Sequence, residues 1–217
     1  MKKATNLIIT LVLLILLFSC KKDQDFTPKT YVYQDYTIGQ IKLITNTGPI
    51  TDTSIINNFL HRIPYFKWFS EPSDFEKGLE IELITNTSGR MKNYLGDYFD
   101  LNITRKNGML YLEGTDTLVD SYSSIFIKNE RFKYFPLYYK EYPNGDFSHV
   151  ECTYVIEEGD IIYMPILYYY EKFKVPYMTT MENANNEFDE KYLFEIQSDT
   201  IVDTIAYQDS RIIYKLK

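Results

Sequence analysis

The clearest pattern in this chain is the alternation of apolar and polar residues over short segments. Phe99, Leu101 and Ile103 fall on one face of such a segment, and the alternation recurs over 192–197 and 211–217. Successive side chains of a β-strand point to opposite faces, so the pattern predicts strands with one buried face. Turn sequences separate the runs: Asn107-Gly108, which suits a type I′ hairpin, and the segments 143–146 and 157–160. The chain is therefore predicted to be all-β, an antiparallel meander.

One segment follows the period of a helix instead. Its apolar residues are spaced three and four apart, namely Ile55, Ile56, Phe59, Leu60 and Ile63. A polar residue at 51–53 can accept the first free N–H groups, and Pro64 ends the helix because the residue before a proline avoids helical geometry. A second, weaker helix is predicted over 181–188.

A meander of this kind, with a helix-bearing connection after its first strand, resembles the lipocalin-like β-barrel. The resemblance concerns architecture, and it implies a closed antiparallel barrel with one or two short helices. A sandwich of two β-sheets is the alternative arrangement of the same strands.

Two segments of seven residues are nearly identical. IKLITNT covers residues 41–47 and IELITNT covers residues 81–87. They are either a duplicated strand-turn unit or a convergent way of ending a strand, and the sequences that follow them differ at once.

The N-terminus carries an apolar run with a basic start. Lys2 and Lys3 precede a segment from Leu7 to Phe18 that is interrupted only by Thr10. As a helix this segment would be about 18 Å long, whereas the hydrocarbon core of a bilayer is about 30 Å thick. It is therefore too short to span a membrane, and it is typical of a secretory signal peptide.

The end of the run resembles the lipobox of bacterial lipoproteins. Leu17-Phe18-Ser19-Cys20 places an aliphatic residue three positions before a cysteine and a small residue directly before it. The resemblance implies cleavage before Cys20 and acylation of its thiol and its new amine. Cys20 would then anchor the chain in a lipid bilayer, because several acyl chains hold a protein stably. Lys21, in place of an aspartate, implies the outer membrane by resemblance to Gram-negative lipoproteins.

These observations divide the chain into three parts. Residues 1–19 are predicted to be the signal peptide, residues 20–30 a lipidated flexible tether, and residues 31–217 a single β-rich domain. With Cys20 lipidated, Cys152 is the only other cysteine. No intramolecular disulfide is expected, so packing must stabilise the domain.

Charge and composition exclude several classes of partner. The net charge is −7 and falls to −9 once Lys2 and Lys3 leave with the signal peptide. An acidic chain is repelled by phosphate backbones, so no nucleic-acid binding is expected. His61 and His149 are the only histidines and lie in no zinc motif, so no metal site and no cofactor are predicted.

No residue stands out as catalytic. If 147–156 is a strand, Cys152 lies on its apolar face as a buried small hydrophobe. His149 and Glu151 share the more polar face, where a solvated surface is the simpler interpretation than a base and its orienting partner.

Aromatic residues give the strongest candidate for a binding surface. A predicted connection holds five of them, Tyr65, Phe66, Trp68, Phe69 and Phe75, which can form a lid or a docking surface for a small molecule, a glycan or a protein. The alternative is that they fold back into the core. Residues 160–173 are apolar on both faces, which predicts a strand covered on both sides or at an interface, with Pro165 at an edge or bulge.

The sequence thus predicts a membrane-anchored lipoprotein with a non-catalytic β domain that binds a ligand or a partner. A cell-envelope hydrolase that acts through carboxylates is one alternative. A structural or assembly accessory of the outer membrane is the other.

Overall fold

The computed structural model describes residues 26–120, 131–135, 139–143, 147–175, 179–192 and 202–217. Within them lie twelve strands and two helices. Their bounds in chain order are β1 (Lys29–Thr37), β2 (Lys42–Thr45), β3 (Gly48–Ile50), α2 (Thr53–His61), α3 (Asp74–Lys77), β4 (Glu80–Leu83), β5 (Ser88–Lys92), β6 (Tyr98–Lys106), β7 (Met109–Asp120), β8 (Tyr139–Glu141), β9 (Phe147–Glu158), β10 (Ile161–Phe173), β11 (Thr179–Ala184) and β12 (Val202–Leu216).

Eight of these strands close into an antiparallel barrel. In chain order β1, β4, β5, β6, β7, β9, β10 and β12 each pair with the next, and β12 pairs back with β1. The predicted all-β meander and the lipocalin-like barrel are confirmed, and the two-sheet sandwich is not found. Both helices lie in the connection from β1 to the next barrel strand. The first, α2, was predicted there, whereas α3 was not predicted.

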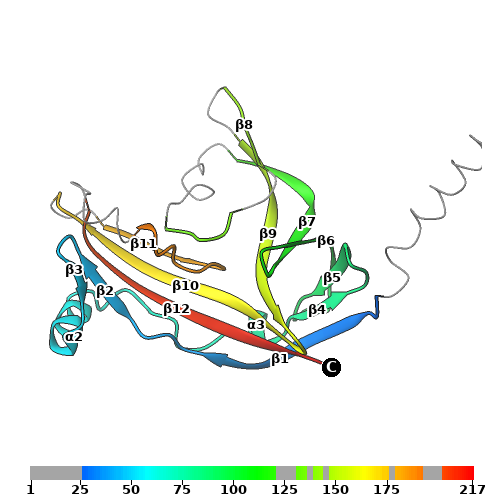
Figure 1. The fold of residues 1–217 in the computed structure, drawn as a ribbon, viewed down its shortest axis with the longest axis horizontal. Helices are drawn as coiled ribbons and strands as arrows, with labels where there is room; N and C mark the ends of the chain where they lie inside the picture. Colours follow the sequence, from blue (N-terminus) through cyan, green and yellow to red (C-terminus); the bar gives the residue numbers. More distant parts are fainter. Residues whose placement is uncertain (1–25, 121–130, 136–138, 144–146, 176–178, 193–201) are drawn as a thin grey trace, which may run out of the picture.

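Two ribbons extend beyond the barrel in different directions (Figure 1). One is the hairpin of β7 and β9, to which β8 adds a short strand. The other is the long pair of β10 and β12, which carries β2, β3 and β11 on its edges. The ribbons separate because β9 pairs with β10 only over Ile161–Tyr163.

Local sequence explains several element ends. Asn107 and Gly108 both have positive φ, 54° and 77°, as the predicted type I′ turn requires. The turn at 157–160 is also confirmed, with Gly159 at φ 63°. The Asp52 side chain accepts hydrogen bonds from the N–H groups of Ser54 and Ile55 and so caps α2. The predicted turn at 143–146 lies largely outside the described residues.

Three expectations need correction. Residues 181–184 belong to strand β11 rather than to a helix, because they pair with β10. Tyr192 lies outside any strand, and the rest of the predicted strand at 192–197 falls outside the described residues. Phe99 is 52% exposed although Leu101 and Ile103 on the same face are buried. In addition, β1 begins at Lys29, within the predicted tether.

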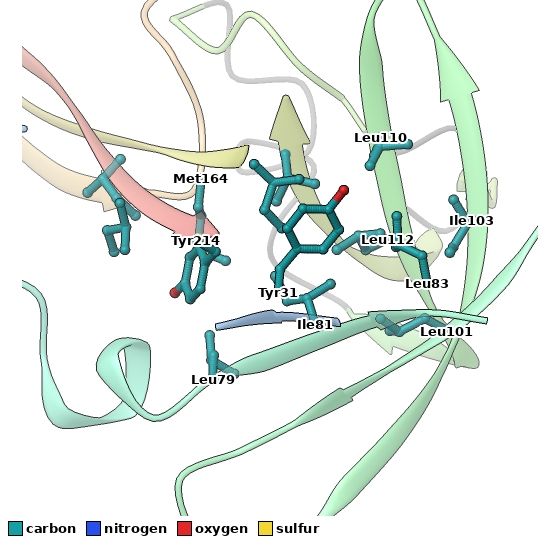
Figure 2. Close-up of a cluster of buried hydrophobic side chains, with 14 of the residues drawn as sticks. Tyr31, Leu79, Ile81, Leu83, Leu101, Ile103, Leu110, Leu112, Met164 and Tyr214 are labelled. Atoms are coloured by element: carbon teal, nitrogen blue, oxygen red, sulfur yellow. The ribbon is translucent and has the colours of Figure 1, made fainter. Parts of the chain in front are cut away.

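The barrel interior holds the main hydrophobic core. Side chains from different strands converge there, among them Tyr31, Ile81, Leu112 and Met164 (Figure 2). One end of the barrel is closed by Phe26, which packs on this core, and by a polar group around Glu157. Glu157 accepts hydrogen bonds from Lys29 Nζ at 2.8 Å and from Tyr31 Oη at 3.2 Å.

A second core covers the outer face of the ribbon formed by β10 and β12. Leu167 and Tyr169 of β10 pack there with Phe132 and Phe188, two residues that pair as an isolated β-bridge. The opposite face of β10 carries Met164 and Ile166 into the barrel core. The predicted strand with two covered faces is therefore confirmed.

Pro165 occupies the gap where β9 has left β10 and β11 has not yet begun. Its carbonyl accepts a hydrogen bond from Asn185 Nδ2 at 2.8 Å. The N and O atoms of one strand residue point to the same side, so the missing N–H also faces this gap rather than β12. Asn185 in addition binds both the N–H and the carbonyl of Tyr154 on β9. One amide side chain thus joins the two separating strands.

The two near-identical segments end in the same turn. Thr45 Oγ1 accepts a hydrogen bond from Thr47 N at 3.3 Å, and Thr85 Oγ1 accepts one from Thr87 N at 3.2 Å. Each turn leads into an antiparallel partner, β3 or β5. The strands themselves differ in place, since β4 is in the barrel and β2 is outside it, which favours convergent turn chemistry over duplication.

Candidate functional site

The barrel opens at the end away from Lys29 because two strands part there. β6 and β7 pair from Lys106 and Met109 only as far as Leu101 and Gly114. Directly beyond, β7 bulges: residues 114–116 lie between Glu113, opposite Cys152, and Thr117, opposite Val150. Bulges of this kind are frequent at barrel rims and beside binding sites, where they end pairing and redirect side chains.

A cavity of about 540 Å³ occupies this mouth. Its floor is apolar, with Leu79, Met91, Leu101 and Leu112, and Phe75, Tyr98 and Phe99 stand at its rim. The exposure of Phe99 is explained by this position, because the side chain points inward where the barrel has no lid.

A neighbouring cavity of about 420 Å³ continues along β10. The two share the residues Phe75, Leu79, Met91, Glu151 and Thr153. Met164, Ile166 and Tyr168 of β10 form its apolar wall. The mouth is therefore one continuous recess rather than two unrelated depressions.

The short helix α3 positions the rim. Ser73 and Glu76 form a reciprocal capping box at its start. The hydroxyl of Tyr214 in the barrel core donates to the carbonyl of Glu76 at 2.8 Å. Gly78 follows the helix, and a Cβ there would overlap Tyr94, so the helix and the turn between β5 and β6 pack closely. Phe75 and Tyr94 also make an edge-to-face contact.

Acidic side chains line the recess. Asp100, Asp116 and Glu151 line the larger cavity, and Glu76 lines the smaller one. Glu76 is engaged in its capping box, and Asp100 lies opposite Arg90 and interacts with its charge. Asp116 and Glu151 make no hydrogen bond or ion pair in the described part of the chain. No lysine, arginine or histidine of the described residues lines either cavity.

The closed end has the opposite character. Burial acts to raise the pKa of Glu157, but the hydrogen bond and charge of Lys29 and the charge of Arg105 outweigh it and hold the pKa below its ordinary value. The charged carboxylate of Glu157 thus joins β9 to Lys29 and Tyr31 of β1. We call this group of three residues the clasp.

Phe75 of the predicted aromatic surface lies at the recess, whereas the other four residues lie against the ribbon of β10 and β12. Phe69 is buried and packs on Tyr168, whereas Phe66 and Trp68 are half-buried with their ring centroids 4.6 Å apart. Tyr65 is 60% exposed, and its hydroxyl lies 3.3 Å from that of Tyr170. The segment folds back onto the tyrosines of β10, and Tyr65 is its most exposed aromatic side chain.

The other candidate residues are not brought together. His61 is exposed on α2, His149 is half-buried on β9, and Cys20 lies outside the described residues. Cys152 is a free thiol on the outer side of β9, and burial raises its pKa to about 12. Such a thiol is a poor nucleophile. Among the described residues no cluster of His, Cys, Asp and Glu is suited to a metal ion.

The sequence did not identify the recess. Of the residues that were singled out as candidates for chemistry or binding, Glu151 and Phe75 line it, and Glu151 was expected on a solvated face. Gly114 was the available signal, because a glycine inside a strand pattern often marks a bulge.

The fold and the recess together define a class, a lipocalin-like barrel with an open, largely apolar mouth. Comparison with protein-family models, with curated proteins and with solved structures finds no match for this chain. In the described residues no helix has the length and apolar character needed to cross a bilayer.

Proposed function

We propose that this protein is a lipoprotein of the bacterial outer membrane, anchored through acylated Cys20, whose barrel binds an apolar small molecule without converting it. The observation that carries the proposal is the recess at the barrel mouth. Its volume of about 540 Å³ lies within the range of small-molecule pockets, and its apolar floor with a few polar groups is their usual composition.

The anchor is supported by the N-terminal sequence alone, and it has its own test. Mass spectrometry of the chain isolated from membranes should find an N-terminal peptide that begins at Cys20 and carries acyl groups. A peptide that retains Met1, or an unmodified Cys20, contradicts this part of the proposal and leaves the binding function open.

Binding is tested by filling the recess. Thr153 lines both cavities, so Thr153→Phe should lower the affinity for dodecyldimethylamine oxide at least about tenfold, because a methylene-sized change in an apolar pocket already costs about 1–3 kcal/mol. Thr117→Phe is the control, since Thr117 lies beyond the bulge and lines neither cavity. Calorimetric titration below the micellar concentration measures both, and thermal unfolding shows whether each variant is folded.

A hydrolase that acts through carboxylates is the second candidate. It is favoured by one observation, namely that Asp116 and Glu151 lie on neighbouring strands beside the same cavity. Incubation with dodecyl maltoside followed by mass spectrometry distinguishes the two functions, because water can cleave its glycosidic bond to give dodecanol and maltose. Intact maltoside supports binding without conversion, and cleavage that is absent with Glu151→Gln supports the hydrolase.

A further inference from the structure

The charge of the recess limits what it can hold. Two carboxylates, those of Asp116 and Glu151, border an apolar floor, and no basic side chain of the described residues lies among the lining. Asp100 is not counted with them, because it lies opposite Arg90 on β5 and interacts with that charge. A ligand with an anionic group would meet uncompensated like charge, which costs free energy at an apolar site where water is partly displaced.

The basic side chains of β5 and α3 do not neutralise these two acids. Arg90 pairs with Glu82, Lys92 pairs with Glu80, and Lys77 pairs with Glu71. Arg90 and Lys92 alternate with the inward Met91, so they face outward, and both lie over the ring of Tyr98. These three basic side chains are therefore each engaged with a carboxylate that does not line the recess.

We infer that the recess selects a cationic amphiphile, a small molecule with an apolar body and one positively charged group. The inference rests on the proposed binding function and names its ligand class. The apolar body lies on Leu101, Leu112 and Met91. The cation stays at the bulge between Asp116 and Glu151, where water still reaches it and its desolvation cost is small.

Phe99 adds to this preference. Its ring stands at the rim of the same cavity and is exposed to it, and aromatic faces attract cations that sit within about 6 Å of their centroid. The carboxylates and the ring together favour a positive head group over a neutral one of equal size.

The experiment compares three probes with the same chain: dodecyltrimethylammonium, dodecyldimethylamine oxide and dodecyl sulfate. The first two have heads of similar size and differ in net charge. Titration uses residues 21–217, because the barrel closes between β1 and β12 and has all its strands within that range. The cation should bind about tenfold more tightly than the amine oxide, since each exposed pair contributes up to about fivefold. The sulfate should bind most weakly.

Variants and salt provide the internal controls. Asp116→Asn combined with Glu151→Gln should lower the affinity for dodecyltrimethylammonium about tenfold and so abolish the preference over the amine oxide. Glu158→Gln is the matched control, because Glu158 lies on the same strand at the closed end. Salt at about 1 M, where the Debye length is about 3 Å, should also reduce the preference.

The outcomes separate the two claims. Equal binding of cation and amine oxide, or a preference that survives in the double variant, overturns the cationic selectivity and leaves the apolar recess as a binding site. Failure of all three probes to bind overturns both.

Discussion

Gly39 shows how a single residue fixes the path of the chain between β1 and β2. It lies against the backbone of β12, where its N–H donates to Ser210 Oγ at 3.1 Å and its carbonyl accepts from Gln208 Nε2 at 3.0 Å. A Cβ at this position would overlap the carbonyl oxygen of Asp209. The two buried polar side chains of β12 therefore depend on a glycine opposite them.

Gly39→Ala should destabilise the protein by about 2–4 kcal/mol, because relief of the overlap moves the chain away and breaks both hydrogen bonds. Gly114→Ala is the control: the nearest atom to its added Cβ is the carbonyl oxygen of Glu151, at an ordinary 3.7 Å. It should change stability by no more than about 0.5 kcal/mol. Urea denaturation measures both, and equal effects would refute the close-approach account.

At the scale of elements, the separation of β9 from β10 depends on one amide side chain. Asn185 satisfies the N–H and carbonyl of Tyr154 and the carbonyl of Pro165. These groups would otherwise be partly buried without partners. Asn185 therefore supplies the hydrogen bonds that β9 and β10 no longer make with each other where they separate.

Asn185→Ala should cost about 1–3 kcal/mol, the cost of leaving such backbone groups unpaired. The exposed Asn183 on β11 is the matched control, and Asn183→Ala should stay within about 0.5 kcal/mol of the original protein. Free energies of unfolding from urea titrations test the pair. If Asn185→Ala is as stable as Asn183→Ala, water can replace the amide, and the hydrogen bonds of Asn185 do not contribute to stability.

The clasp at the closed end predicts a dependence on pH. The pKa of Glu157 is lowered in the folded protein, so its contribution is present above the unfolded pKa and is lost as pH falls through the folded pKa. The free energy of unfolding should therefore fall below about pH 4.5. Glu157→Gln should be less stable than the original protein at neutral pH and should lose less on acidification. If the free energy of unfolding falls equally steeply with pH in the two proteins, Glu157 is not the source of the pH dependence.

Elements with strong local signals could be predicted from the sequence. The Asn107-Gly108 turn, the helix capped by Asp52 and the doubly covered strand at Pro165 each follow from a few neighbouring residues. Residues 181–188 could not be predicted, because their strand and loop structure is imposed by pairing with β10 and by the hydrogen bonds of Asn185. The recess was missed for the same reason, since its lining comes from six different strands and α3.

At the scale of the whole molecule, the barrel closes by joining the two ends of the chain. β1 and β12 pair from Tyr31 and Leu216 to Thr37 and Arg211, and the N–H of Lys217 donates to the carbonyl of Thr30 at 2.8 Å. The C-terminus lies beside the start of β1 (Figure 1). The fold is thus a ring of neighbouring hairpins with one seam.

A ring of this kind should tolerate circular permutation. A short glycine-rich link from Lys217 to Lys29, with new ends opened in the Asn107-Gly108 turn, preserves every strand pair of the barrel. The permuted protein should show the same β-rich circular dichroism and a cooperative thermal transition. Opening the chain within β12 instead interrupts its pairing with β1 and β10 and should abolish folding. A permutant opened at 107–108 that fails to fold would indicate that this hairpin must form first.

The position of the seam also sets an orientation. β1 starts at the end sealed by Glu157, so the proposed acyl anchor at Cys20 would hold that sealed base toward the lipid. The aperture at the opposite end would then face the aqueous compartment. The ligand would therefore enter the barrel from solution rather than directly from the bilayer.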